Sequence, residues 1–99
     1  MNIFDDFKIY FKGFDPSLEV KNKILLKIKN FYDLCPSNGI LMVSIEKNKE
    51  YRITLSLNSA GVNIEESEIN QEIFNGLYEV LRKSEEVLDI WKRERFKGE

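Results

Sequence analysis

The chain has 99 residues, which is the size of one domain, so we expect residues 1–99 to form a single domain. Its 42% of hydrophobic residues exclude a disordered chain, and its 32% of charged residues are typical of a soluble one. The formal net charge of −2 does not favour a nucleic-acid-binding protein, because such domains are usually basic.

Side chains that carry catalytic or metal chemistry are scarce. The sequence has no histidine, which removes the commonest general base and the commonest metal ligand. Its one cysteine, Cys35, can form neither an internal disulfide nor a zinc site, and its five glycines are scattered singly. We therefore expect no enzyme, no metal and no cofactor, and we interpret Cys35 as an incidental thiol in a reducing compartment.

The N-terminal residues bear on location. Residues 1–6 lack the basic and apolar regions of a signal peptide. No apolar run approaches the roughly 20 residues that cross a bilayer. These features predict a cytoplasmic protein without a membrane segment.

The first predicted elements are a strand over residues 7–12 and a helix that ends near Tyr32. Apolar and polar residues alternate along the strand, which is typical of a half-buried position in a sheet. Asp15 and Pro16 predict the helix start, as the N-cap and the first helical residue. The polar side of this helix carries Glu19, Lys23, Lys27 and Asn30.

Two further alternating runs, residues 41–46 and 52–57, are joined by a short polar turn and predict a β-hairpin. After a second turn at residues 58–61, Val62 and Ile64 predict a fourth strand, shorter than the others.

The last third predicts a long amphipathic helix from about Glu68 to about Phe96. Acidic residues, including Glu65 and Glu66, lie at its expected start and basic residues at its end, where each sign complements the helix dipole. Its predicted apolar stripe consists of Ile69, Ile73, Leu77, Val80, Leu81, Val87, Leu88 and Trp91.

This element order predicts an α+β fold, β-α-β-β-β-α. Each helix has one apolar stripe and each long strand one apolar face, so the two helices are expected to pack on one face of a four-stranded sheet as a two-layer sandwich. The other face is polar and would meet solvent or a partner. It carries Lys8, Tyr10, Lys12, Ser44, Arg52, Thr54 and Ser56.

Four strings in the chain, taken in order and spacing, resemble the short form of the ribosome hibernation-promoting factor family, which includes ribosome-associated inhibitor A. They are residues 27–33 (KIKNFYD), 45–47 (IEK), 53–58 (ITLSLN) and 74–83 (FNGLYEVLRK). The register of the resemblance holds over nearly the whole chain with small gaps.

The resemblance implies a non-enzymatic factor of ribosome hibernation and the stress response. Such a protein binds the small ribosomal subunit, with its 16S-type rRNA, in the decoding channel and blocks messenger and transfer RNA there. Its affinity would come from basic side chains set against phosphates. This chain departs from the family pattern at Val80, where a lysine is frequent, and at residues 85–89, where an acidic string replaces basic residues.

The candidate RNA contacts lie on the two helices. Lys27 is the first choice, and the basic string at residues 92–97 is the second region. The alternative for each is a solvated helix face, with neighbours such as Glu19 and Lys23 or Arg82 and Glu86 paired four residues apart. The predicted RNA-binding set is Lys27, Lys83, Lys92, Arg93 and Arg95.

Other interpretations stay open. An acidic protein–protein interaction module, of an inhibitor or immunity type, fits the net charge and the five glutamates between positions 65 and 79. A relative that kept the fold and lost ribosome affinity is also possible on sequence grounds. Trp91 is expected in the core rather than as a base-stacking platform, and outward-facing Tyr10, between Lys8 and Lys12, is a weaker stacking candidate. The expected oligomeric state is a monomer or weak dimer, with no small-molecule substrate.

Overall fold

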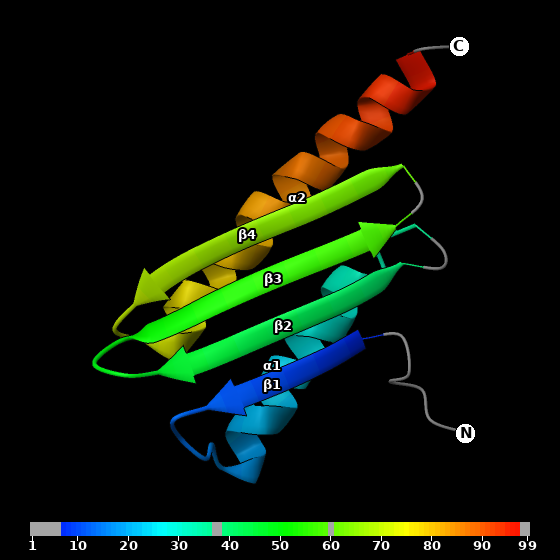
Figure 1. Cartoon of the computed structure of the whole chain (residues 1–99). Coiled ribbons are helices and arrows are strands. Elements are labelled where there is room, and N and C mark those ends of the chain that lie inside the picture. The colour runs from blue at the N-terminus through cyan, green and yellow to red at the C-terminus, as the bar shows by residue number, and fades with distance from the viewer. Residues whose placement is uncertain (1–6, 37–38, 60, 98–99) are drawn as a thin grey trace.

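The computed structural model describes residues 7–36, 39–59 and 61–97, with residues 95–97 described by backbone only. The elements follow the predicted order, and Figure 1 shows both helices on one side of the sheet. They are β1 (Phe7–Lys12), α1 (Leu18–Tyr32), β2 (Ile40–Lys47), β3 (Tyr51–Ser59), β4 (Val62–Asn70) and α2 (Ile73–Lys97). The predicted α+β sandwich is confirmed.

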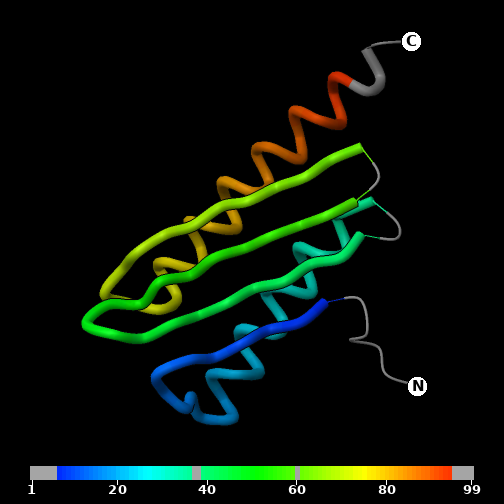
Figure 2. The backbone as a smooth tube through the Cα atoms, viewed as in Figure 1, coloured from blue at the N-terminus to red at the C-terminus, as the bar shows by residue number. Residues whose placement is uncertain are grey.

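The sheet has the order β1-β2-β3-β4. β1 runs parallel to β2, whereas β2, β3 and β4 are antiparallel to their neighbours. Parallel strands need a long crossover connection, and α1 supplies it by returning the chain from the end of β1 to the start of β2 (Figure 2). Neighbouring strands in this order are also neighbours in sequence, so position across the sheet follows position along the chain.

The core lies between the sheet and the two helices. One face of every strand contributes buried residues, and both helices bury one stripe against them. The fully buried side chains include Ile24 and Ile28 of α1, Ile53 of β3 and Leu77 of α2. Gly76 allows α2 to approach the sheet closely, because a Cβ there would displace the end of the Ile53 side chain.

The start of α1 differs from the prediction. Asp15 is not the N-cap and Pro16 is not the first helical residue. Ser17 caps the helix instead, since its Oγ accepts a hydrogen bond from the backbone N–H of Val20 at 3.2 Å. The Asp15 carboxylate lies 3.6 Å from Lys21 Nζ, so it pairs with a side chain of the first turns.

The boundary between β4 and α2 was also predicted wrongly. β4 is nine residues long rather than short, and it continues to Asn70 opposite Tyr51 of β3. Glu65, Glu66 and Glu68 therefore belong to the strand and not to a helix start. Ile69 is half exposed on the open sheet face rather than part of the helix stripe.

Candidate nucleic-acid interface

The lysines of α1 are mostly neutralised by neighbouring acids. Lys21 lies 3.6 Å from Asp15, Lys23 lies 3.5 Å from Glu19, and Lys29 lies 3.3 Å from Asp33. The predicted pair of Glu19 and Lys23 is thus confirmed. Lys27 is exposed and forms no ion pair with any residue that the structure describes. Of the four lysines on this helix, Lys27 is the one free to contact a partner.

Lys27 lines a groove of about 430 Å³ between α1 and α2. The α2 wall of this groove is acidic, with Glu85 and Asp89 facing the space opposite Lys27. The groove residues are Lys27, Asn30, Tyr78, Leu81, Arg82, Glu85, Glu86 and Asp89, which carry two positive and three negative charges. The first-choice RNA contact therefore lies in a surface that repels phosphate on balance.

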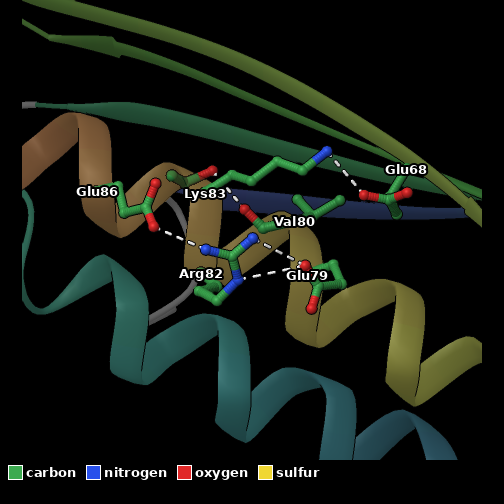
Figure 3. A network of polar contacts seen from close by, with 7 residues as sticks. Glu68, Glu79, Val80, Arg82, Lys83 and Glu86 are labelled. Carbon is green, nitrogen blue, oxygen red and sulfur yellow. Dashed lines mark hydrogen bonds and ion pairs between the residues drawn. The ribbon is translucent and has the colours of Figure 1, made fainter.

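Arg82, the other cation of the groove, is held by two glutamates of its own helix (Figure 3). Its guanidinium donates to Glu79 Oε1 at 3.0 Å and to Glu86 Oε1 at 2.7 Å. The hydrogen bond to Glu79 also raises the pKa of Arg82 above its ordinary value. The predicted pairing of Arg82 and Glu86 is confirmed, and this part of α2 neutralises itself.

Lys83 points the other way, toward β4. Its Nζ lies 2.7 Å from Glu68 Oε2, with the two side chains about one-third exposed (Figure 3). The hydrogen bond to Glu68 raises the pKa of Lys83, against a smaller effect of desolvation. Lys83 thus ties α2 to β4, whereas Glu79 pairs with Arg82 of its own helix.

The basic residues at the end of α2 also differ in whether they have a partner within the chain. Lys92 Nζ donates to the backbone carbonyl of Leu34 at 3.0 Å, which fastens α2 to the segment after α1. Arg93 is exposed and forms no ion pair within the described part of the chain. Arg95 lies in the last turns of the helix, and its side chain lies outside the described residues. The structure does not gather on one face the four predicted contacts whose side chains it describes, which are Lys27, Lys83, Lys92 and Arg93.

Beside Lys92 lies the single thiol of the chain. Half-burial raises the pKa of Cys35 from 9.0 to about 11, while the positive charge of Lys92 lowers it by a smaller amount. The Cys35 thiol donates to the backbone carbonyl of Phe31 at 3.5 Å. A thiol with so high a pKa is a poor nucleophile at neutral pH, which agrees with the expectation of an incidental cysteine.

The sheet face opposite the helices is uncovered (Figure 1). The registers place the outward side chains in rows across the strands, because successive residues of a strand alternate between faces. One row is Tyr10, Ser44, Thr54 and Ser67, which is a line of hydroxyl groups without charge. Lys8 and Lys12 flank Tyr10 on β1, and Arg52 lies on β3.

These open-face cations differ from most of the helix cations, which are ion-paired with an acid, although Glu46 lies beside Lys12 and Arg52 in the strand registers. Lys8, Lys12 and Arg52 are exposed and form no ion pair with the residues that the structure describes. The sequence analysis predicts that this face meets solvent or a partner, but it places the candidate RNA contacts on the helices. The alternation of Lys8, Tyr10 and Lys12 was the available signal.

Charge is divided across the sheet. Residues 7–64, which form β1, α1, β2, β3 and the start of β4, carry nine basic and five acidic side chains, a net of +4. Residues 65–94, the remainder of β4 and most of α2, carry four basic and nine acidic side chains, a net of −5. Since sheet order follows chain order, the β1 side of the molecule is positive and the β4 side is negative.

Among the described residues, no group of three or more His, Cys, Asp or Glu side chains is placed to hold a metal ion. Within the same ranges, no helix is long and apolar enough to cross a membrane.

Sequence comparisons find no relative. The chain matches no protein-family model, and a search of curated proteins found no match.

Structural comparison does find related folds. The N-terminal domain of Thermus thermophilus Protein Y superposes with a TM-score of 0.70 at 7% identity, covering 84% of this chain and 94% of that domain. A ribosomal subunit interface protein from Coxiella burnetii superposes with a TM-score of 0.69 at 15% identity, covering 88% of this chain and 97% of that one. Both matches agree with the resemblance to the hibernation-promoting factor family, and at these identities they establish that this chain shares the fold.

Proposed function

We propose that this protein is a ribosome-associated factor that binds the small subunit in its decoding channel, inhibits translation there and helps to keep ribosomes idle during stress. It acts by binding, in the cytoplasm and as a monomer or weak dimer, and it catalyses no reaction. The observation that carries the proposal is the shared fold with a ribosomal subunit interface protein over 88% of this chain. The absence of histidine from the sequence supports a non-catalytic role.

The uneven distribution of charge makes the net charge of −2 compatible with an RNA partner. A negative total of −2 would disfavour an RNA partner only if the charge were spread evenly. Instead, the excess of acid lies in residues 65–94, and the β1 side keeps a positive surface. Phosphate attraction acts mainly within a Debye length of about 8–10 Å, so a local positive face is sufficient for contact.

The proposal is tested by co-sedimentation of the purified protein with isolated small and large subunits over a series of salt concentrations. We expect pelleting with the small subunit at low salt and a steep loss as salt rises. Subunits already programmed with messenger and transfer RNA should exclude the protein if it occupies the decoding channel. Failure to pellet with small subunits at low salt would sink the proposal.

The predicted helix contacts are tested in the same assay. If the helix cations are the RNA contacts, charge reversal at the two unpaired ones, Lys27→Glu with Arg93→Glu, abolishes pelleting. The matched control is Lys23→Glu with Lys29→Glu, which changes the net charge equally at two lysines that already pair with acids. Equal behaviour of the two double variants would mean that Lys27 and Arg93 are not contacts.

A second candidate function is an acidic module that binds a basic protein, and the net charge of −5 over residues 65–94 favours it. This alternative predicts that Glu65→Gln with Glu66→Gln weakens binding of the partner. The ribosome proposal predicts that the same change leaves small-subunit pelleting intact or strengthens it.

A further inference from the structure

The open sheet face carries a combination of groups that the helices lack. Along β1, Tyr10 is 45% exposed and its same-face neighbours on the strand are Lys8 and Lys12. The rise of a strand puts the Cα atoms of the two lysines about 13 Å apart, with the phenol midway between them. β1 contains no acidic residue. An aromatic ring between two unpaired cations fits a base with its flanking phosphates.

The rest of the central row supplies uncharged polar groups. From Tyr10 the register leads to Ser44, Thr54 and Ser67 on the three following strands. Each hydroxyl can donate and accept a hydrogen bond, as the edges of bases require. Such contacts need bases that are not already paired, and an extended single strand presents them. The exposed Met42, beside Lys8 in the register, adds apolar surface next to the ring.

The acidic groups of this face limit where the strand can lie. Glu65 occupies the same row as Lys8 but three strands away, about 14 Å by the usual strand spacing, which exceeds the Debye length of about 8 Å in physiological salt. Glu46 is closer, since it lies on β2 between Lys12 and Arg52 in the register. Phosphates are therefore favoured along β1, near Lys8 above all, and disfavoured toward β4.

We propose that the β1 side of the open sheet face binds a single-stranded segment of the small-subunit rRNA, with Tyr10 stacking on a base and Lys8 and Lys12 contacting phosphates. The inference rests on the proposed function for the source of the RNA. It differs from the sequence-based assignment, which placed the contacts on the helices, where most lysines of α1 and the basic residues Arg82 and Lys83 pair with acids.

The test measures affinity for messenger-free small subunits by pelleting, over a salt series, and separately affinity for a fluorescein-labelled ten-nucleotide oligouridylate by anisotropy. Lys8→Gln with Lys12→Gln should make the negative slope of log K against log salt less steep by about 1.4. This change corresponds to an affinity loss on the order of 25-fold at 0.1 M salt. The matched control is Lys23→Gln with Lys29→Gln, which removes the same charge from the ion-paired lysines of α1.

Single variants at Tyr10 and Glu46, with Tyr78 as a control position, separate the contribution of stacking from that of charge. Tyr10→Ala should weaken binding about 5- to 150-fold without changing the salt slope, because it removes a stacked ring and no charge, while Tyr10→Phe should bind as the wild type does. Tyr78→Ala is the aromatic control, since Tyr78 is 63% exposed on α2. Glu46→Gln should tighten binding about two- to fivefold, a gain that loss of folding cannot produce.

Each outcome decides a different claim. If the wild type pellets but the Lys8/Lys12 variant behaves as its control does, or Tyr10→Ala has no effect, the inference is overturned and the proposed function stands. If the wild type does not pellet but binds the oligouridylate through Lys8, Tyr10 and Lys12, the ribosome proposal and the rRNA source fail, and single-strand binding by this face is supported. If neither RNA is bound, or the face instead mediates dimerisation seen by sedimentation velocity, the inference is overturned.

Discussion

The β1–α1 side and the β4–α2 side of the molecule share one core but differ in charge. Residues 7–64 carry a net of +4, whereas residues 65–94 carry −5. On the β1 side the open sheet face keeps exposed cations without acidic partners, and on the β4 side the cations Lys83 and Arg82 are held by glutamates. The total charge of a small domain is therefore a poor guide to its partner when the two signs lie on opposite edges of a sheet.

The largest expected effect tests whether the two sides fold as one unit. Ile28→Ala in α1 and Leu77→Ala in α2 each remove a side chain with no exposed surface. Each variant should lose about 2–5 kcal/mol of unfolding free energy, because a cavity is left in a shared core. Urea denaturation followed by Trp91 fluorescence and by far-UV circular dichroism should show one coincident transition for both variants. Separate transitions for the two probes would show that the sides unfold independently.

The second prediction concerns the junction between the sides, where Cys35 lies near Lys92. With a pKa of about 11 rather than 9.0, the folded thiol should be alkylated by iodoacetamide at pH 8 about 100-fold more slowly than in the urea-unfolded chain. Lys92→Gln should slow the reaction further, because the lost positive charge had favoured the thiolate. A folded-state rate equal to the unfolded rate would contradict the burial of this thiol.

The same thiol links stability to pH. The folded state favours the protonated thiol, because its pKa is raised there. The contribution of the thiol to the free energy of unfolding is therefore fully present below a pH of about 9 and is lost as the pH rises through about 11. Cys35→Ala should remove this component of the alkaline loss of stability, as measured by urea titrations at several pH values. An unchanged alkaline profile would assign the loss to other groups.

A smaller effect would sharpen the charge comparison at the groove between the helices. Glu85→Gln with Asp89→Asn removes two carboxylates that line the groove opposite Lys27. If Lys27 contacts RNA, small-subunit affinity should rise about two- to fivefold at low salt, and the gain should fade as salt rises. The control, Glu66→Gln with Glu72→Gln, removes the same charge away from both the groove and the open sheet face. Equal gains in both variants would indicate a general charge effect and no contact at Lys27.

The smallest effect concerns the ion pair between Lys83 and Glu68, which joins α2 to β4. Glu68→Gln should lower the urea midpoint slightly, and 1 M salt should remove the difference, because the pair is partly exposed. The pKa of Lys83 is raised in the folded state, so the contribution is present at neutral pH and disappears only as alkaline pH deprotonates Lys83. A double-mutant cycle with Lys83→Gln isolates the coupling, which should be absent above the folded-state pKa of Lys83.

The fold was predictable because most elements show their period in the sequence. Alternation marked β1, β2 and β3, and the 3.6-residue period marked both helices. The prediction failed after Ile64, where the inward positions of β4 are occupied by Glu66 and Glu68. Without apolar residues the alternation disappears, and glutamate favours a helix more than a strand. Pairing with β3, which continues to Tyr51 opposite Asn70, overrides that local preference.

The candidate site was less predictable for a related reason. The exposure of Lys27 follows from the helical period, and it was predicted correctly. The partners of Lys83 and Lys92 are a strand residue and a backbone carbonyl from other elements, and no periodicity in the sequence reports such long-range pairing. The open-face cations were visible as an alternating pattern, but the strand registers decide which residues lie beside them. Glu46 falls between Lys12 and Arg52, whereas Lys8 lies opposite Met42.

The glutamates of β4 also bear on how the molecule avoids its own copies. β4 ends the sheet, so its outer backbone N–H and C=O groups face no further strand of the described fold. A nine-residue edge strand of this kind is a template for edge-to-edge pairing and aggregation. Glu65, Glu66 and Glu68 place like charges along it, and an antiparallel copy would bring them face to face. The same residues that obscure this strand in the sequence thereby oppose the addition of a further strand at the β4 edge of the sheet.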